Sequence, residues 1–358
     1  MSGQPELSSS REGDAVDASS SVPDLADAHW FPVDLHVPRR EFGFLPIASA
    51  VLERSIFLDT RIEAPLPEAV AVGADAVAQA TMAAAPLGWL FHTSFCCSTL
   101  LARILHLPPY QVVLKEPLVL RRLGDARHER WPIEDLLEPT LRLLARPWDP
   151  GGAVVIKPTH AALNIAVELL DATPQSRGVI LTSSLDDFLV SNLKKTSDTQ
   201  AKVPALAERA LQAGAFHSRL PPGALAPPDL LAAAALQWAA QRELCADLMA
   251  AVGSQRLRVL DASTLLADVP GVAWQCAQWL RLPVPRDLLA ARAGEVSGRN
   301  AKAVEAAYDA HRRASDVRWL QARFGRQIVA ARHWFDQMVM PAMREEALAV
   351  AGVPWQGS

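Results

Sequence analysis

Side chains that could do acid–base or electrostatic chemistry follow two apolar segments of the sequence. Lys115 and Glu116 come directly after QVVL, and Lys157 comes directly after GAVVI. A carboxylate such as Glu116 can take a proton from a hydroxyl, and the ammonium of Lys115 or Lys157 can neutralise charge that builds on a leaving oxygen. His160 and His92 are alternative bases. The alternative interpretation of Glu116 is a salt bridge with a nearby Lys or Arg.

A second candidate site is the segment HTSFCCSTLL, which lies between the apolar run GWLFH and a helix-like segment. A turn that leaves a strand and starts a helix directs several backbone N–H groups to one point, where the helix dipole adds roughly half a positive charge. Ser98 and Thr99 can add hydroxyl donors, although Ser and Thr are also ordinary N-caps. The segment has no GxxxxGK[ST] pattern, so the sequence predicts a phosphate-binding loop but no ATP-hydrolysing P-loop.

The elements that must position these residues alternate between strands and helices. Short apolar runs predict strands at GWLFH, QVVLKEP, GAVVIKP, RGVILTS and QRLRVLDAS, and helix-like segments separate them. This alternation predicts an α/β fold with a doubly wound parallel sheet and a P-loop-like strand–loop–helix. Strong helical patterns predict a helical insertion over 201–252, broken at PPGALAPP, and a helical C-terminus. Lys194 and Lys195 are expected on a solvated helix face.

The chain divides into three parts in this interpretation. Residues 1–28 are rich in Ser, Asp and Glu and predict a disordered tail. Residues 29–86 predict short strands in PVDLHV, FGFLPIA and RSIFLDTRI, followed by a helix over 65–85. Residues 87–358 form the α/β domain.

Four stretches between residues 88 and 285 resemble, in this order, the motifs of the sulfotransferase family. HTSFCCSTLLARIL resembles the donor-binding loop, and KEP is similar to the Glu-Pro of carbohydrate sulfotransferases. VILTSSLDDFLVS resembles the second phosphate-binding element, with Ser191 at its Ser position. RVLDASTLLADVPGVAWQCAQWLRLPV is similar to the family's later strand and helix.

The resemblance implies an enzyme that transfers a sulfuryl group from PAPS, its co-substrate, to an unknown hydroxyl or amine acceptor. It assigns donor binding to residues of the loop, the second element and a late basic segment, which are Thr93, Ser94, Cys97, Ser98, Thr99, Ser183, Ser191, Arg299 and Lys302. Glu116, Lys157, Lys115 and His160 remain the catalytic candidates. Acceptor specificity would come from 118–150 and 196–230.

Two positions depart from the family's pattern. Phe95 stands where the loop usually has Lys or Arg, and Ser183 stands where the second element usually has Arg. Each lost charge-assisted contact would cost about 1.5–3 kcal/mol. Either Lys115 or Lys157 compensates, or the ligand differs. A phosphotransferase that needs magnesium and a non-catalytic descendant that binds a nucleotide or a partner protein are therefore the alternative functions.

Composition restricts the partners and the compartment. The chain has 358 residues and a net charge of −4, which gives no reason to expect nucleic acid as the main partner. No apolar run reaches the ~18 residues of a membrane span, and no signal peptide is recognisable. The four cysteines form neither a disulfide framework nor a zinc pattern, so we expect no metal and a cytoplasmic protein. Abundant Ala, Leu, Arg and Pro are typical of a GC-rich bacterial genome. The helical C-terminus could form a homodimer face.

Overall fold

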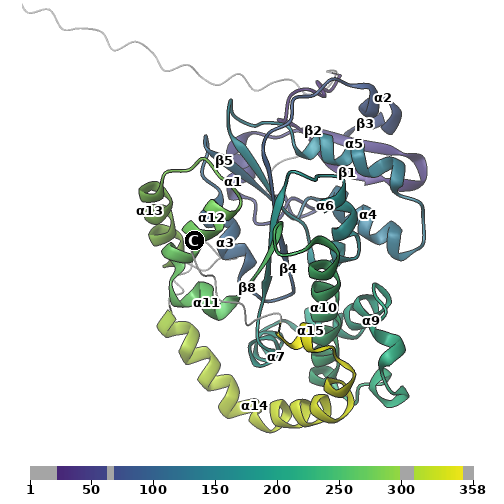
Figure 1. The fold of residues 1–358 in the computed structure, drawn as a ribbon, viewed down its shortest axis with the longest axis vertical. Helices are drawn as coiled ribbons and strands as arrows, with labels where there is room; N and C mark the ends of the chain where they lie inside the picture. The colour runs from purple at the N-terminus through teal and green to yellow at the C-terminus, as the bar shows by residue number, and fades with distance from the viewer. Residues whose placement is uncertain (1–21, 63–67, 299–309, 350–358) are drawn as a thin grey trace, which may run out of the picture.

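A five-stranded parallel sheet forms the centre of the molecule (Figure 1). The computed structural model describes residues 22–62, 68–298 and 310–349. The strands lie in the order β5-β6-β4-β7-β8, and every neighbouring pair is parallel. Their bounds are β4 (Leu87–His92), β5 (Gln111–Lys115), β6 (Ala153–Lys157), β7 (Arg177–Thr182) and β8 (Leu257–Asp261). The predicted α/β fold with a parallel sheet is confirmed.

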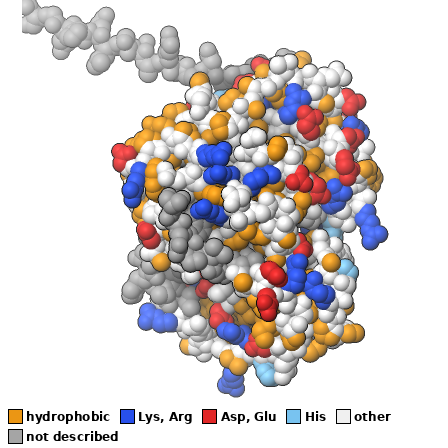
Figure 2. All heavy atoms as spheres, viewed as in Figure 1, with side chains coloured by type: hydrophobic (Ala, Val, Ile, Leu, Met, Phe, Trp, Pro, Cys, Tyr) orange, Lys and Arg blue, Asp and Glu red, His pale blue; other side chains and the backbone are white. Residues whose placement is uncertain are grey.

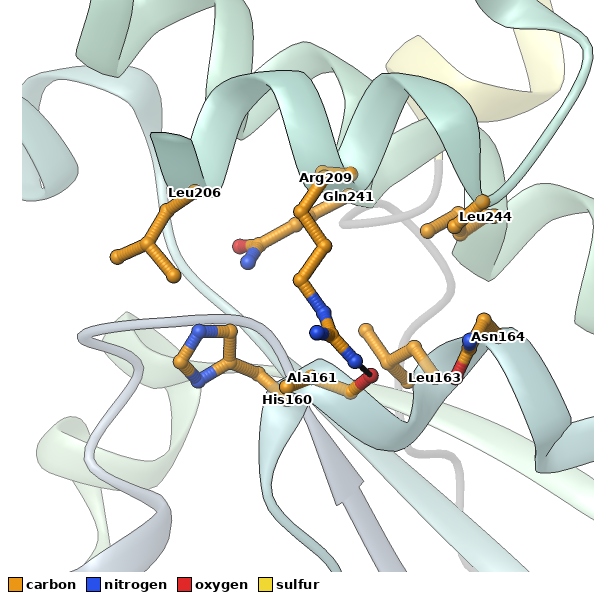
Figure 3. A pocket seen from close by; sticks show the side chains of 10 residues that line it. His160, Ala161, Leu163, Asn164, Leu206, Arg209, Gln241 and Leu244 are labelled. Carbon is orange, nitrogen blue, oxygen red and sulfur yellow. Dashed lines mark hydrogen bonds between the residues drawn. The ribbon is translucent and has the colours of Figure 1, made fainter. Parts of the chain in front are cut away.

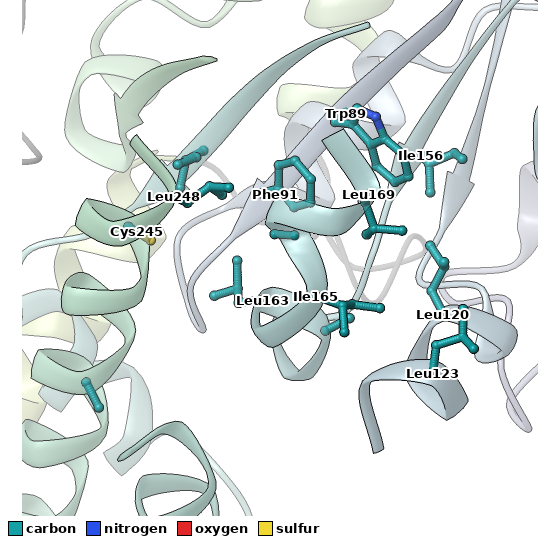
Figure 4. Packing of buried hydrophobic residues seen from close by; sticks show 14 of the residues in the cluster. Trp89, Phe91, Leu120, Leu123, Ile156, Leu163, Ile165, Leu169, Cys245 and Leu248 are labelled. Carbon is teal, nitrogen blue, oxygen red and sulfur yellow. The ribbon is translucent and has the colours of Figure 1, made fainter. Parts of the chain in front are cut away.

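Alternate side chains of each strand enter two separate cores. Leu90 and Val155 face α3 (Ser98–Leu105), α12 (Val269–Trp279) and α13 (Arg286–Ser297). Trp89, Phe91 and Ile156 face the opposite layer (Figure 4), whose helices are α4 (Leu118–His128), η2 (His160–Ile165), α6 (Ala166–Asp171) and α10 (Leu230–Val252). The strands are buried on both faces, which is why they read as continuous apolar runs.

The connections of two neighbouring strands leave toward opposite faces of the sheet. The chain passes from β4 into α3, whose apolar residues belong to one core, and from β6 into η2 and α6, whose apolar residues belong to the other. In open α/β sheets such a switch point creates a crevice at the carboxyl ends of the strands, where ligands bind. The ends of β4 and β6 are therefore the expected place for a site.

The N-terminal part forms a small antiparallel sheet in the order β1-β2-β3. Its elements are β1 (Trp30–His36), η1 (Val37–Arg39), β2 (Glu41–Pro46), α1 (Ser49–Arg54), β3 (Val70–Gly73) and α2 (Ala74–Gln79). β3 lies where a helix was predicted, because Val72 and Val70 pair with Phe42 and Phe44 of β2. The segment 55–62 was predicted as a strand, but it forms no strand in the structure.

The segment 55–62 instead crosses the end of the parallel sheet. The amide of Leu58 donates to the carbonyl of Lys115 (2.6 Å), and the amide of Leu118 donates to the carbonyl of Leu58 (3.0 Å). Its backbone hydrogen bonds are thus made to the end of β5 and the start of α4 rather than to β1 or β2. This brings the N-terminal part against the carboxyl edge of the sheet.

Helices fill the predicted insertion and the C-terminus. The remaining elements are α5 (Glu134–Leu144), α7 (Leu185–Leu193), α8 (Ser197–Gln200), α9 (Val203–Gln212), η3 (Phe216–Arg219), η4 (Pro222–Leu225), α11 (Ala262–Ala267), α14 (Ala310–Met338), η5 (Met340–Ala342) and α15 (Glu345–Ala349). The guanidinium of Arg242 on α10 donates to the carbonyls of Ala347 and Leu348, which fixes α15 against α10.

The surface carries charges of both signs. Figure 2 shows Asp and Glu beside Lys and Arg over much of one face, together with a group of basic side chains near its centre. Within the described ranges, no helix combines the length and the apolar character that a membrane span requires.

Candidate functional site

Four titratable side chains meet where β4, β5 and β6 end, and we call them the Glu116 cluster. Glu116 follows β5, Lys157 ends β6, His92 ends β4 and His160 begins η2. The ammonium of Lys157 donates to Oε1 of Glu116, and Nε2 of His92 lies 3.7 Å from the same oxygen. The ring centroids of His92 and His160 are 6.2 Å apart. Glu116 thus forms the salt bridge that the sequence left open as its alternative role.

Burial and the ion pair set the charges in the Glu116 cluster. Burial alone would raise the pKa of the Glu116 carboxyl, but the positive charge of Lys157 and the neighbouring His92 outweigh it and lower the pKa to about 2. Burial, assisted by the charge of Lys157, lowers the pKa of His92 to about 3. Burial also lowers the pKa of His160 to about 4. At pH 7 the cluster therefore holds a carboxylate and two neutral imidazoles beside the Lys157 side chain.

The protonated nitrogen of His92 can be assigned from its surroundings. Nδ1 of His92 lies 2.9 Å from the carbonyl oxygen of Thr93. A carbonyl only accepts hydrogen bonds, so Nδ1 carries the proton and Nε2 of the neutral ring keeps its lone pair. Nε2 of His92 is buried and has no hydrogen-bond partner in the described part of the chain. It is therefore available as a base.

The loop 93–97 joins β4 to α3 without a glycine. Phe95 and Cys97 adopt left-handed backbone conformations, with φ of 60° and 63°. Glu116 does the same, with φ of 57°. Such a conformation costs a non-glycine residue roughly 1–2 kcal/mol. Strained residues of this kind concentrate at binding and catalytic sites.

The start of α3 provides the predicted helix N-terminus. Ser98 and Thr99 occupy its first turn and are buried. Backbone amides in a first turn have no partner within the helix and can bind an anion. The thiol of Cys96 donates to the carbonyl of Thr93, and burial raises its pKa to about 12. Cys96 is therefore not a nucleophile near neutral pH.

Helix α10 covers one side of the loop. The amide of Ser94 donates to Oε1 of Gln241 (3.0 Å), and its hydroxyl contacts Nε2 of Gln241 (3.3 Å) and of Gln237 (3.4 Å). The amide of Ser94, which was predicted to bind the donor, thus donates to α10, and its hydroxyl oxygen accepts from the same helix. Gln237 and Gln241 lie more than 140 residues further along the chain, and no local motif could have indicated this contact.

The ammonium of Lys195 lies over the ring of Phe95, the loop residue that stands where a basic residue was expected. The ammonium of Lys195 is 5.0 Å from the centroid of the Phe95 ring, and Phe188 of α7 meets the same ring edge-on at 5.3 Å. Ser191 follows Phe188 by one helical turn and is half-buried. Lys195, expected on a solvated helix face, lies two residues beyond the end of α7, is half-buried and contacts the loop through the Phe95 ring.

Two predicted residues make other contacts. The ammonium of Lys115 donates to the carbonyl of Glu53 at the end of α1 (3.0 Å), so it caps that helix. The side chain of Ser183 is completely buried, and among the described residues its Oγ has no hydrogen-bond partner, while its carbonyl accepts from Trp238 (2.9 Å). The positions 299 and 302, predicted to bind the donor through Arg299 and Lys302, lie outside the described residues. The described residues contain no group of three or more His, Cys, Asp and Glu that could hold a metal ion.

Comparison with known proteins identifies similarity at the level of solved structures. No family model matches the chain, and no curated protein matches it. A sulfotransferase from Alicyclobacillus acidocaldarius matches with 17% identity and a TM-score of 0.37, over 70% of this chain and 100% of its own. The sulfotransferase domain from the curacin biosynthetic pathway matches with 11% identity and a TM-score of 0.38, over 76% and 100%. A sulfotransferase from Mycobacterium avium matches with 15% identity and a TM-score of 0.31, over 58% and 50%. These three structures bear the name of the family that the sequence resembles, and at such distances no residue role is transferred from them.

Proposed function

We propose that the chain is a sulfotransferase-like enzyme that transfers a sulfuryl group from PAPS to a hydroxyl or amine. The observation that carries this proposal is the buried ion pair of Lys157 with Glu116 at the switch point of the sheet, next to the loop that starts α3. The pair is joined there by a neutral histidine with a free lone pair, His92. A cation, a base and a helix N-terminus are the groups that this reaction needs.

The donor would bind across the loop and the first turn of α3. The amides of that turn and the hydroxyls of Ser98 and Thr99 would hold the 5′-phosphosulfate. Lys195 above Phe95 and Lys157 at the end of β6 would supply the positive charge that the sequence lacks at position 95. Ser191 on α7 would contact the 3′-phosphate.

The transfer would proceed by one displacement at sulfur. The acceptor oxygen forms a bond to sulfur while the bond from sulfur to the donor's phosphate oxygen breaks, and the electron pair stays on that oxygen. Lys157 would stabilise the charge that develops there. The hydroxyl proton becomes strongly acidic as its oxygen bonds to sulfur, so a weak base is sufficient. Nε2 of His92 or the carboxylate of Glu116 would take this proton, leaving a sulfated acceptor and PAP.

Titration with PAP, the desulfated donor product, tests this proposal. We expect saturable binding of PAP by calorimetry and much weaker binding of AMP, because AMP lacks the 3′-phosphate. Lys195→Gln should weaken PAP binding about tenfold, the effect of one charge-assisted contact. Lys194→Gln is the matched control, since Lys194 lies next in the chain but its ammonium pairs with Asp316 of α14 (3.8 Å). Absence of PAP binding up to millimolar concentration would refute the proposal.

A non-catalytic descendant of the fold is the second candidate. It is favoured by the contacts of Ser94, whose amide and hydroxyl are bonded to Gln241 rather than exposed for a ligand. Release of PAP from PAPS in the presence of an acceptor separates the two candidates, because a binding protein would hold PAP without turnover. A requirement for magnesium together with ATP binding would instead indicate a phosphotransferase.

A further inference from the structure

A groove of about 530 Å³ opens between the N-terminal sheet and α4. Its walls come from residues 34–38 at the end of β1 and in η1, from residues 121–131 in and after α4, and from Arg209 of α9. Its volume lies within the range of about 300–1,000 Å³ that is typical of small-molecule sites. The α4 residues and Arg209 belong to the two stretches, 118–150 and 196–230, in which acceptor specificity was expected.

Paired charges line this groove. Arg122 donates to both carboxylate oxygens of Asp34 (2.8 and 3.2 Å). The carboxylate of Asp125 forms ion pairs with Arg209 (2.6 Å) and Arg121 (3.3 Å). The groove has three arginines and three carboxylates, so it carries no marked net charge from these groups. Each guanidinium has five N–H donors and each carboxylate about four acceptor sites, and the pairs use only part of them. The walls therefore offer donors and acceptors side by side, which suits a neutral ligand with many hydroxyls better than an anion.

An exposed tryptophan stands at the same groove. The side chain of Trp131 is 45% exposed, although its backbone is held by a hydrogen bond from its amide to the carbonyl of Ala126 (2.9 Å). A rigid aromatic ring next to polar groups gives a ligand one apolar face to stack on and several hydrogen-bonding partners. The C–H face of a sugar ring and its hydroxyls match this combination.

One residue, Arg209, links the groove to the surroundings of the Glu116 cluster. Arg209 lines both the groove and a small cavity of about 20 Å³, which His160 also lines (Figure 3). Burial lowers the pKa of His160 while Glu116 raises it, and the positive charges of Arg121, Lys157 and Arg209 lower it further. Arg209 is thus shared by the groove and by the cavity that His160, a member of the cluster, lines.

The small cavity can hold one water molecule. Nε of Arg209, Oδ1 of Asn164 and Nε2 of His160 are buried and have no hydrogen-bond partner in the described part of the chain. About 10–15 Å³ suffices for a water, which makes about three hydrogen bonds when buried. A water here could accept from Arg209, donate to Asn164 and contact His160.

We propose that this groove is the acceptor site and that its ligand is a neutral saccharide. This inference rests on the proposed function for the direction of transfer, but the binding of saccharide does not depend on it. The sugar ring would stack on Trp131, and its hydroxyls would bond to the Arg122–Asp34 and Arg209–Asp125 pairs. The hydroxyl nearest Arg209 would then be the one directed to His160.

Binding of unmodified sugars tests the inference without any donor. We would measure maltose, cellobiose and N-acetyllactosamine by saturation-transfer-difference NMR, with 4-nitrophenol as the aromatic alternative. We expect saturable binding of at least one disaccharide, weakened about tenfold or more in Trp131→Ala through loss of stacking. Trp319→Ala is the matched control, because Trp319 is 57% exposed on α14 and does not line the groove. Asp34→Asn should weaken the same sugar severalfold by removing a charged acceptor.

The parallel PAP titration separates failure of this inference from failure of the proposed function. PAP binding without binding of any of the three disaccharides overturns the saccharide inference and leaves the enzyme proposal standing. The same holds if 4-nitrophenol binds at Trp131 while the sugars do not, or if a sugar binds equally well to Trp131→Ala. Sugar binding that Trp131→Ala weakens, in a protein that does not bind PAP, supports the groove and refutes the sulfotransferase proposal.

Discussion

Lys115 and Lys157 end two neighbouring strands, and the parallel register of β5 and β6 places them directly opposite each other. Both side chains are about 1% exposed. Lys157 faces the carboxylate of Glu116, whereas Lys115 donates to a backbone carbonyl, that of Glu53. Burial lowers the pKa of Lys115 to about 7, and the like charge of Arg103 contributes. Two identical residues at equivalent strand ends thus belong to regions with different chemistry, because one has a buried counter-charge and the other does not.

Removing Lys157 should have the largest effect on stability. Lys157→Met leaves the carboxylate of Glu116 buried without its counter-charge, and breaking a buried pair in this way costs about 3–5 kcal/mol. Urea unfolding measures this loss. The double variant Lys157→Met with Glu116→Gln should recover more than half of it, because no unpaired charge remains. Equal losses in the single and the double variant would contradict the account.

Lys115 should make the stability of the protein depend on pH. Its pKa is lowered in the folded protein from the ordinary 10.5 to about 7, so the unfolded chain binds more protons between these values and stability rises with pH. The slope approaches about 1.4 kcal/mol per pH unit above pH 7. We expect the unfolding free energy to rise with this slope up to about pH 8.5. Above that pH, cysteines of the unfolded chain begin to titrate and add their own pH dependence. Lys115→Met should flatten this slope, and an unchanged slope would show that Lys115 is not its source.

Two histidines extend the comparison to acid. Burial lowers the pKa of both His92, in the Glu116 cluster, and His106, near Lys115, from 6.5 to about 3. Each remains neutral in the folded protein while the unfolded chain takes up a proton, so stability falls as the pH drops from 6.5 toward 3. The loss is up to about 1.4 kcal/mol per pH unit for each histidine.

Asparagine variants should separate the two histidines by function. His92→Asn and His106→Asn should each reduce the acid slope by a similar amount in urea unfolding at pH 4.5–6.5, because each removes one buried titrating group. Only His92→Asn should lower the turnover of PAPS, since only His92 lies beside Glu116. Equal turnover in both variants would exclude His92 as the base.

Ser183 should give the smallest effect. Its Oγ is buried and has no hydrogen-bond partner among residues 22–62, 68–298 and 310–349, and an unsatisfied buried hydroxyl destabilises a protein. Ser183→Ala should therefore raise the unfolding free energy by about 1 kcal/mol or less and leave PAP affinity unchanged. Weaker PAP binding in this variant would show that Ser183 contacts the donor after all.

The sequence predicted the parts of this protein that depend on local patterns. Continuous apolar runs identified the five parallel strands, because strands buried on both faces need no polar alternation. The segment after GWLFH was recognised as a strand–loop–helix. The position of Lys157 and Glu116 at the carboxyl edge of the sheet was predicted because charged residues at the end of a buried strand must lie at the edge of a sheet. The prediction of the small N-terminal sheet was less accurate, because the segment 55–62 forms hydrogen bonds with the distant end of β5 rather than with the adjacent strands β1 and β2.

Only the tertiary structure decided how these parts meet. The strand order determined that β6 lies between β5 and β4, and both Lys157 and His92 approach the carboxylate of Glu116. Lys195 lies over Phe95 although 100 positions separate them. Gln241, on a helix in another layer, accepts a hydrogen bond from the amide of Ser94. Periodicity specifies that a strand or helix forms, but it does not specify its neighbours. Charge and accessibility at a site depend on those neighbours, because the pKa of a buried ammonium or imidazole is set by the groups that desolvate it or pair with it.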